Sequence, residues 1–330
     1  VERVSASPVA MRRMRIGRFV FVGLVLVYLA YRLTSIGWGS VVASLPTTPF
    51  FYGLVLVMYF LLPCSEALIY SRIWGTAYRK CLAPLLYKRV LNQDVVDYSG
   101  EVYLFMWTKG RIALTKRAIA ATMKDNLIVS SIVSISTAVA LLGFLLVTGL
   151  IIPTDLVHDP SWMYVVGGAV IAGFLGGLIA RFRKAIFSLP RRQLVEMGGI
   201  HTARFFLGYA LQVLQWWVVV PEASFQSWAL LLVLMVVTNR IPFLPSKDLV
   251  FVGAGVEMSA MLDVPAAAVA SMLLVRSLSD KLLNLAIFTV FSLRREDPAK
   301  STTSPEENGA LAPYNVAPAT DKEVPALDAG

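Results

Sequence analysis

The feature that most constrains this chain is an apolar run, Leu127–Ile152, of 26 residues without a charge or a proline. About 20 consecutive apolar residues in a helix are enough to cross the hydrocarbon core of a bilayer. The run therefore predicts a transmembrane helix, and with it a protein whose function depends on the few polar residues that a membrane interior tolerates.

Composition agrees with this prediction. Hydrophobic residues make up 57% of the chain and charged residues 15%, whereas a soluble domain carries about 25% charge. The formal net charge is +9. Its basic residues lie in loops beside apolar segments, which indicates orientation in a membrane and contact with anionic lipid. No groove-reading motif is present, so we expect no nucleic-acid partner.

The sequence predicts an all-α integral membrane protein with about six full transmembrane helices and two broken or re-entrant hairpins. The first span follows a basic start without a small-residue cleavage site, so we expect it to be retained. The expected spans are Gly17–Leu33, Pro49–Tyr70, Leu127–Ile152, Trp162–Ala180, Thr202–Val220 and Val264–Phe291.

Orientation follows from the distribution of lysine and arginine. The first eighteen residues hold five, Ser71–Asn126 holds ten and Arg181–Arg204 holds six. The alternate connections hold none; these are Thr34–Thr48, Pro153–Ser161 and Pro221–Ser227. The positive-inside rule then places both termini in the cytoplasm of a multi-pass protein of the plasma (inner) membrane. It also places five tryptophans at the outer interface as an aromatic belt: Trp38, Trp162, Trp216, Trp217 and Trp228.

Three other segments have distinctive composition. The Gly173-x-x-x-Gly177 spacing favours close packing of another helix. Arg181–Gly199 mixes basic and apolar residues and is expected on the inner surface. Pro, Ala, Ser, Glu and Asp dominate from residue 297 onwards. We therefore predict a polytopic domain over residues 1–293 and a disordered cytoplasmic tail over 294–330.

Two apolar stretches are short and interrupted. Leu82–Trp107 must begin and end in the cytoplasm, as an interfacial helix pair or a hairpin that dips into the membrane. Trp228–Leu262 must begin and end outside, and it turns near Pro242 and Pro245. Each arm is short for a span, so a hairpin from the outer face fits, with two additional full spans as the alternative. One hairpin from each side suggests an inverted repeat, which in transporters marks a site at the midplane.

The candidate site consists of polar residues at membrane depth. A charged group there costs about 2.5–3.5 kcal/mol on the insertion scale, so it usually faces a cavity or a partner. The expected substrate-binding residues are Glu66, Asn92, Glu101, Asn239, Arg240, Lys247, Glu257, Arg276 and Asp280. Arg276 and Asp280 are one helical turn apart and can pair. We expect Arg276 and Glu257 to line one polar cavity, with Arg240 and Asp280 at its edge.

Other chemistry is not indicated. Cys64 and Cys81 form no CxxC motif, and His158 and His201 are expected in separate loops, which is too few ligands for a zinc site. No nucleophile elbow or phosphate-binding loop is present. We therefore predict no catalytic residue, no metal and no cofactor.

The same residues carry a family resemblance. Asn92 followed by Ser99-Gly100-Glu101, and Pro242-x-x-Pro245 followed by Gly253, Gly255 and Glu257, resemble the two motifs of the transmembrane region of lysylphosphatidylglycerol synthases, a flippase-like family of integral membrane proteins. The last-helix arginine of the family resembles Arg276. The likeness covers roughly Gly17–Phe291, with Val95-Val96 where Leu-Pro is usual and Ser246-Lys247 where two glycines are usual.

The resemblance implies movement of lipids, or of lipid-linked molecules, between leaflets. The sequence after Arg295 is an acidic tail without room for the soluble synthase domain, so we do not expect aminoacyl transfer. Our first expectation is thus a translocase for an anionic lipid head group, and not an enzyme. The alternatives are an accessory subunit of an envelope-assembly complex, with a biosynthetic protein as partner, and an integral-membrane enzyme acting on a lipid-linked substrate.

Overall fold

The computed structural model describes residues 8–95, 98–147, 183–241 and 244–293. All regular structure in these ranges is helical. The helices are α1 (Pro8–Ile36), α2 (Trp38–Ala43), α3 (Pro49–Trp74), α4 (Tyr78–Val90), the π-helical turn η1 (Leu91–Val95), α5 (Ser99–Lys109), α6 (Lys116–Val147), α8 (Arg183–Ile186), α9 (Arg191–Val219), α10 (Phe225–Arg240), α11 (Lys247–Met258) and α12 (Ala266–Leu293). The expectation of an all-α protein is confirmed for the described part of the chain.

Two of the described helices are long and apolar enough to cross a membrane. They are α3 and α6, whose most apolar windows have mean hydropathies of 1.8 and 2.2. This suggests a membrane protein. In α12, by contrast, Arg276, Asp280 and Lys281 interrupt an otherwise uncharged helix of 28 residues.

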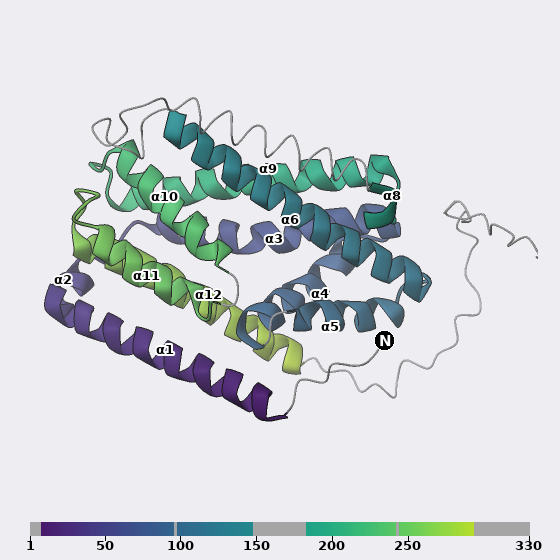
Figure 1. Ribbon diagram of the computed structural model, residues 1–330, viewed down its shortest axis with the longest axis horizontal. Helices are drawn as coiled ribbons and strands as arrows, with labels where there is room; N and C mark the ends of the chain where they lie inside the picture. The colour runs from purple at the N-terminus through teal and green to yellow at the C-terminus, as the bar shows by residue number, and fades with distance from the viewer. Residues whose placement is uncertain (1–7, 96–97, 148–182, 242–243, 294–330) are drawn as a thin grey trace, which may run out of the picture.

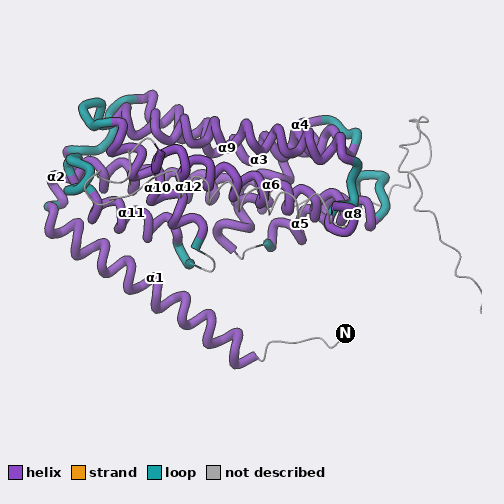
Figure 2. Tube along the Cα trace, turned by 45° about the horizontal axis from the view of Figure 1, so that its top comes forward, coloured by secondary structure: helices purple, strands orange, loops and turns teal. Residues whose placement is uncertain are grey.

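Both broken stretches form a pair of helices whose two arms pack on each other. In the first, α4 and η1 are followed by α5, which begins at Ser99 after Tyr98 with a positive φ of 66°. In the second, α10 ends at Arg240 and α11 begins at Lys247. The two hairpins enter the bundle from opposite ends of its long axis, and the described residues next to both turns lie near its middle (Figures 1 and 2).

The chain order repeats after α6. Helix α3, the hairpin α4–α5 and helix α6 have the same order as α9, the hairpin α10–α11 and α12. The first hairpin contacts α12 through α4, and the second contacts α6 through α10. Such reciprocal contacts are expected when two halves are related by an inverted repeat.

Two apolar cores hold the bundle together. One, around Trp216, Trp228 and Leu231, joins α9 and α10 to α11 and α12. The other, around Tyr70, Leu85 and Leu104, joins α3 to the first hairpin. Trp216 and Trp228 are each only 1% exposed, so they belong to the core and not to the aromatic belt expected from the sequence. Trp38 and Trp217 are exposed at 52% and 50%, as a belt requires.

The helix boundaries differ most from those expected from the sequence in the segments that are rich in basic residues. Helix α9 begins at Arg191, eleven residues before the expected Thr202, and it includes the last nine residues of the segment expected to lie on the inner surface. The reason is packing: Leu194 and Met197 are buried against α3 and its neighbours. Similarly, α6 begins at Lys116. The expected span Trp162–Ala180, with Gly173 and Gly177, and the expected tail 294–330 lie outside the described residues.

Candidate functional site

The first hairpin brings a buried lysine between two carboxylates. Lys88 of α4 is 6% exposed, and its Nζ lies 2.8 Å from Oε1 of Glu66 and 3.3 Å from Oε1 of Glu101. Glu66 comes from α3 and Glu101 from α5, so the lysine fastens both arms of the hairpin to a long helix. Removal of one partner from a buried pair leaves an uncompensated charge, which makes this cluster structurally important.

A chain of buried polar groups extends from Glu66. Asn126 of α6 donates its Nδ2 to Glu66 Oε1 at 3.4 Å and to the Tyr70 hydroxyl at 3.3 Å. The Asn126 Oδ1 lies 3.0 Å from Nε2 of His201. His201 is fully buried inside α9, so the expectation that it lies in a loop is wrong. The chain links α3, α6 and α9 at a depth where an unpaired polar group would be costly.

The first sequence motif has a structural explanation. Asn92 Oδ1 accepts a hydrogen bond from the backbone N–H of Gly100 at 2.7 Å, across the turn of the hairpin. A Cβ atom on Gly100 would lie 2.2 Å from the backbone oxygen of Lys88, so only glycine permits the two arms to come this close. Asn92 and Gly100 thus shape the hairpin and position Glu101 against Lys88.

A second cluster lies between the hairpin turn and α12. Asn284 of α12, 2% exposed, accepts a hydrogen bond from the Tyr59 hydroxyl at 2.5 Å and donates to Gln93 at 3.1 Å and to Asp94 at 2.6 Å. Asp94 also forms an ion pair with Lys281 of α12, which lies one turn before Asn284. These bonds tie α3, η1 and α12 together.

Two arginines border this second cluster. Arg276 Nη2 lies 3.3 Å from Oδ2 of Asp280, which confirms the expected one-turn pair. Arg276 Nη1 also donates to the backbone oxygen of Val55 at 3.2 Å. Arg89 places its guanidinium 4.3 Å from the centroid of the Tyr59 ring. Both arginines also lie within electrostatic range of Asp280.

Arg89 differs from Arg276 in its partners. Among the residues that the structure describes, no carboxylate lies within ion-pair distance of Arg89, and its Nε is buried without a hydrogen-bond partner. A guanidinium that stacks on tyrosine and has no carboxylate partner can donate to an anion that enters the site. The pair Arg89 and Arg276 therefore provides positive charge where an oxyanion could be bound.

The second sequence motif packs against α1. A Cβ on Gly253 would lie 3.5 Å from Leu29 Cδ2, and Glu257, one turn later, accepts hydrogen bonds from the Tyr28 hydroxyl and from Arg32. Glu257 is thus paired with α1, whereas the ion pair of Arg276 is with Asp280. The structure does not bring Glu257 and Arg276 together in the way expected from the sequence.

The remaining expected residues lie at the second hairpin turn. Lys247 donates to the backbone oxygen of Asn239 at 3.0 Å, which closes the turn. The side chain of Arg240 lies outside the described part. At this turn, Asp248 also lies within electrostatic range of Arg276, in addition to its ion-pair partner Asp280.

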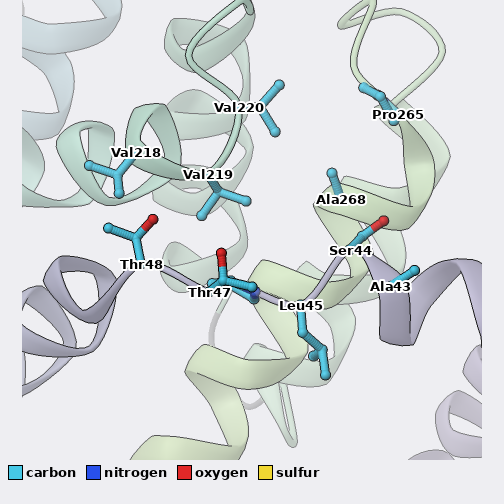
Figure 3. Close-up of a pocket in the computed structure, with 11 residues that line it drawn as sticks. Ala43, Ser44, Leu45, Thr47, Thr48, Val218, Val219, Val220, Pro265 and Ala268 are labelled. Carbon is cyan, nitrogen blue, oxygen red and sulfur yellow. The ribbon is translucent and has the colours of Figure 1, made fainter.

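A cavity of about 370 Å³ lies beside the end of α2 (Figure 3). Its walls come from the α2–α3 connection, the end of α9 and the start of α12. Ser44, Thr47 and Thr48 contribute hydroxyls, and Val218 and Ala268 are among the apolar residues. No expected site residue lines this cavity, so it is separate from both charged clusters.

Comparisons with known proteins add no identification: no family model, no curated protein and no solved structure matches the chain. Within the described residues, no group of three or more His, Cys, Asp or Glu side chains could hold a metal ion.

Sequence reasoning missed several residues of these clusters. Lys88 and Arg89 stand side by side within an apolar stretch, and this tandem was the available signal. Arg32, Tyr59 and Asn284 had none, because their partners are more than 200 residues away in the chain.

Proposed function

We propose that this chain is a multi-pass protein of the plasma (inner) membrane with cytoplasmic termini. In this arrangement α1, α3, α6, α9 and α12 span the membrane, together with the apolar segment Trp162–Ala180, and the two hairpins enter it from opposite sides. The support is the length and hydropathy of α3 and α6, the one-sided basic residues, and hairpin turns that lie near the middle of the bundle (Figure 2).

We propose further that the protein moves an anionic lipid, or a lipid-linked precursor, between leaflets. The single observation that carries this proposal is the pair Arg89 and Arg276, where Arg276 has a carboxylate partner and Arg89 has none among the described residues. A guanidinium matches the oxygens of a phosphate in a bidentate fork. At this depth, the phosphate of a head group is the anion that the cluster fits best.

The charge balance near the hairpin turns favours the same ligand. In the sequence of the two turns and of the facing part of α12, five cations occur with four carboxylates: Arg89, Arg240, Lys247, Arg276 and Lys281 with Asp94, Asp97, Asp248 and Asp280. An excess of positive charge is costly in hydrocarbon when the site is empty and is offset when an anion is bound. In our account, the carboxylates hold the cations until the head group arrives.

The test uses the full chain, purified and reconstituted in liposomes with a trace of fluorescent anionic phospholipid in both leaflets. A reductant that cannot cross the membrane removes the outer fluorescence, and continued loss of the inner fluorescence reports transfer. Transfer above that of empty liposomes supports a translocase. Covalent change of the lipid would indicate an enzyme instead, and neither activity would leave the accessory-subunit alternative.

A further inference from the structure

The contact between α1 and α11 contains an ion pair that the proposed midplane site does not use. Tyr28 and Arg32 are one turn apart on α1, and Gly253 and Glu257 are one turn apart on α11. The two faces meet where Gly253 has no side chain, so that Leu29 packs directly on the backbone of α11. Arg32 and Glu257 therefore face each other at a close helix crossing.

This ion pair is accessible from outside the protein. The side chain of Arg32 is 33% exposed and that of Glu257 is 45% exposed. The flanking residues of α1 are apolar and more exposed still, with Val27 and Tyr31 at 69% each. A charged pair within an apolar, exposed surface is available to a ligand that has both a charge and an apolar part.

Among the described residues, Arg32 is the cation near the end of α1. It lies four residues before the end of α1, which is followed by α2. The sequence has no lysine or arginine in residues 33–71, 205–239 or 248–275, which supply the other helix ends and connections described there. The charged residues in those connections are acidic, Glu222 and Asp263. An anion that reaches this end of the protein therefore meets positive charge at Arg32.

The geometry at Arg32 suits exchange of one oxyanion for another. Its Nη2 donates to Glu257 Oε2 at 3.0 Å, and its Nε lies within ion-pair distance of Oε1, which accepts a hydrogen bond from the Tyr28 hydroxyl. A phosphate oxygen can accept from the same guanidinium. A half-exposed ion pair contributes little stability, so a phosphate can displace the carboxylate without disrupting the helix crossing.

We propose that Arg32 is a second phosphate site, at the outer end of α1, which takes the phosphate of a lipid from the outer leaflet while Glu257 holds the arginine when the site is empty. This inference rests on the proposed function, because it gives a translocase a second binding site at the outer side, in addition to the proposed midplane pair of Arg89 and Arg276. It assigns Glu257 the role of a competitor for the ligand, and not that of a ligand-binding group.

The test uses a fluorescent reporter close to Arg32 and Glu257. Met261 is 80% exposed and lies four residues after Glu257, beyond the end of α11, so Met261→Cys can carry an environment-sensitive fluorophore after Cys64 and Cys81 are replaced by alanine. The full chain in detergent is titrated with dioctanoyl phosphatidic acid, and in a parallel arm with inorganic phosphate. We expect a saturable response to the lipid and a much weaker response to inorganic phosphate. An equal response to both would overturn the assignment to a lipid.

Two variants then move the affinity in opposite directions. Arg32→Gln should abolish the saturable response. Glu257→Gln should tighten lipid binding by about two- to fivefold, because it removes the competing charge of a surface pair. Arg72 and Glu196 provide the control, since they form another half-exposed Arg–Glu pair between two helices at the opposite end. Arg72→Gln and Glu196→Gln should leave the titration unchanged.

The inference fails if Arg32→Gln and Glu257→Gln change the affinity in the same direction, or if neither changes it. Arg276→Lys separates this result from the proposed function, because it should impair leaflet transfer and leave the outer titration unchanged. Loss of transfer in Arg276→Lys with no effect of Arg32→Gln on the titration would remove the outer site alone. Normal transfer in Arg276→Lys, with loss of the saturable response in Arg32→Gln, would exclude the midplane site alone.

Discussion

Lys88 and Arg89 are neighbours in the chain, yet their side chains enter different clusters. Lys88 is enclosed by the carboxylates of Glu66 and Glu101, whereas Arg89 stacks on Tyr59 without a carboxylate partner among the described residues. The turn of a helical hairpin thus presents one neutralised cation, which fixes the hairpin, and one cation that remains available. This division separates the structural role of the hairpin from its proposed role in binding.

The neutralised lysine should be essential for stability. Lys88→Met removes the cation between Glu66 and Glu101, and we expect a loss of about 3–5 kcal/mol in the free energy of unfolding, because a buried carboxylate is left unpaired. Arg72→Met breaks the half-exposed pair with Glu196 and should cost about 1 kcal/mol or less. Unfolding of the purified variants in detergent measures both. Equal losses would show that the Lys88 cluster is not buried as the structure describes.

The close approach in the first hairpin should exclude any side chain at residue 100. Gly100→Ala would place its Cβ against the backbone of α4, and backbone cannot move aside cheaply. We expect at least about 1–3 kcal/mol of destabilisation, the usual cost of overpacking. Gly143→Ala on α6 is the matched control, since a Cβ there has open space around it. Thermal unfolding compares the two, and a stable Gly100→Ala protein would contradict the packing of α5 on α4.

The second hairpin should open to the outer side, with both of its ends on one face of the membrane. Ser227 is buried and its hydroxyl donates to Leu262, so reporter cysteines are better placed at the exposed Glu222 and Met261. In intact cells both should react with an impermeant thiol reagent, and a cysteine at Lys109 should not. Reaction at only one of the two outer positions would mean that α10 and α11 are not a hairpin from that side.

Several features of this fold follow from the sequence alone. The apolar runs of α3 and α6 predict long helices because helix length and hydropathy are local properties. The break between α10 and α11 follows from two prolines and the polar residues around them. By contrast, the start of α9 at Arg191 depends on burial of Leu194 and Met197 by other helices, which no local pattern encodes.

The site was less predictable than the fold for the same reason. The Arg276–Asp280 pair is local and could be expected from one-turn spacing. The partner of Glu257 could not, because Arg32 lies 225 residues away and on a helix expected to serve only as a span. Asn92 and Gly100 were identified as a motif, but only their hydrogen bond across the turn shows that they shape the hairpin.

The most direct test of the central claim is leaflet transfer of an anionic phospholipid by Arg89→Lys and Arg276→Lys in liposomes. Lysine keeps the charge but loses the planar fork that matches phosphate, so we predict that each variant inserts normally and transfers lipid about tenfold more slowly or worse. Arg72→Lys, at the surface pair with Glu196, should transfer lipid at the wild-type rate. Wild-type rates in both Arg89→Lys and Arg276→Lys would contradict the account, and would show that these two arginines do not handle the head group.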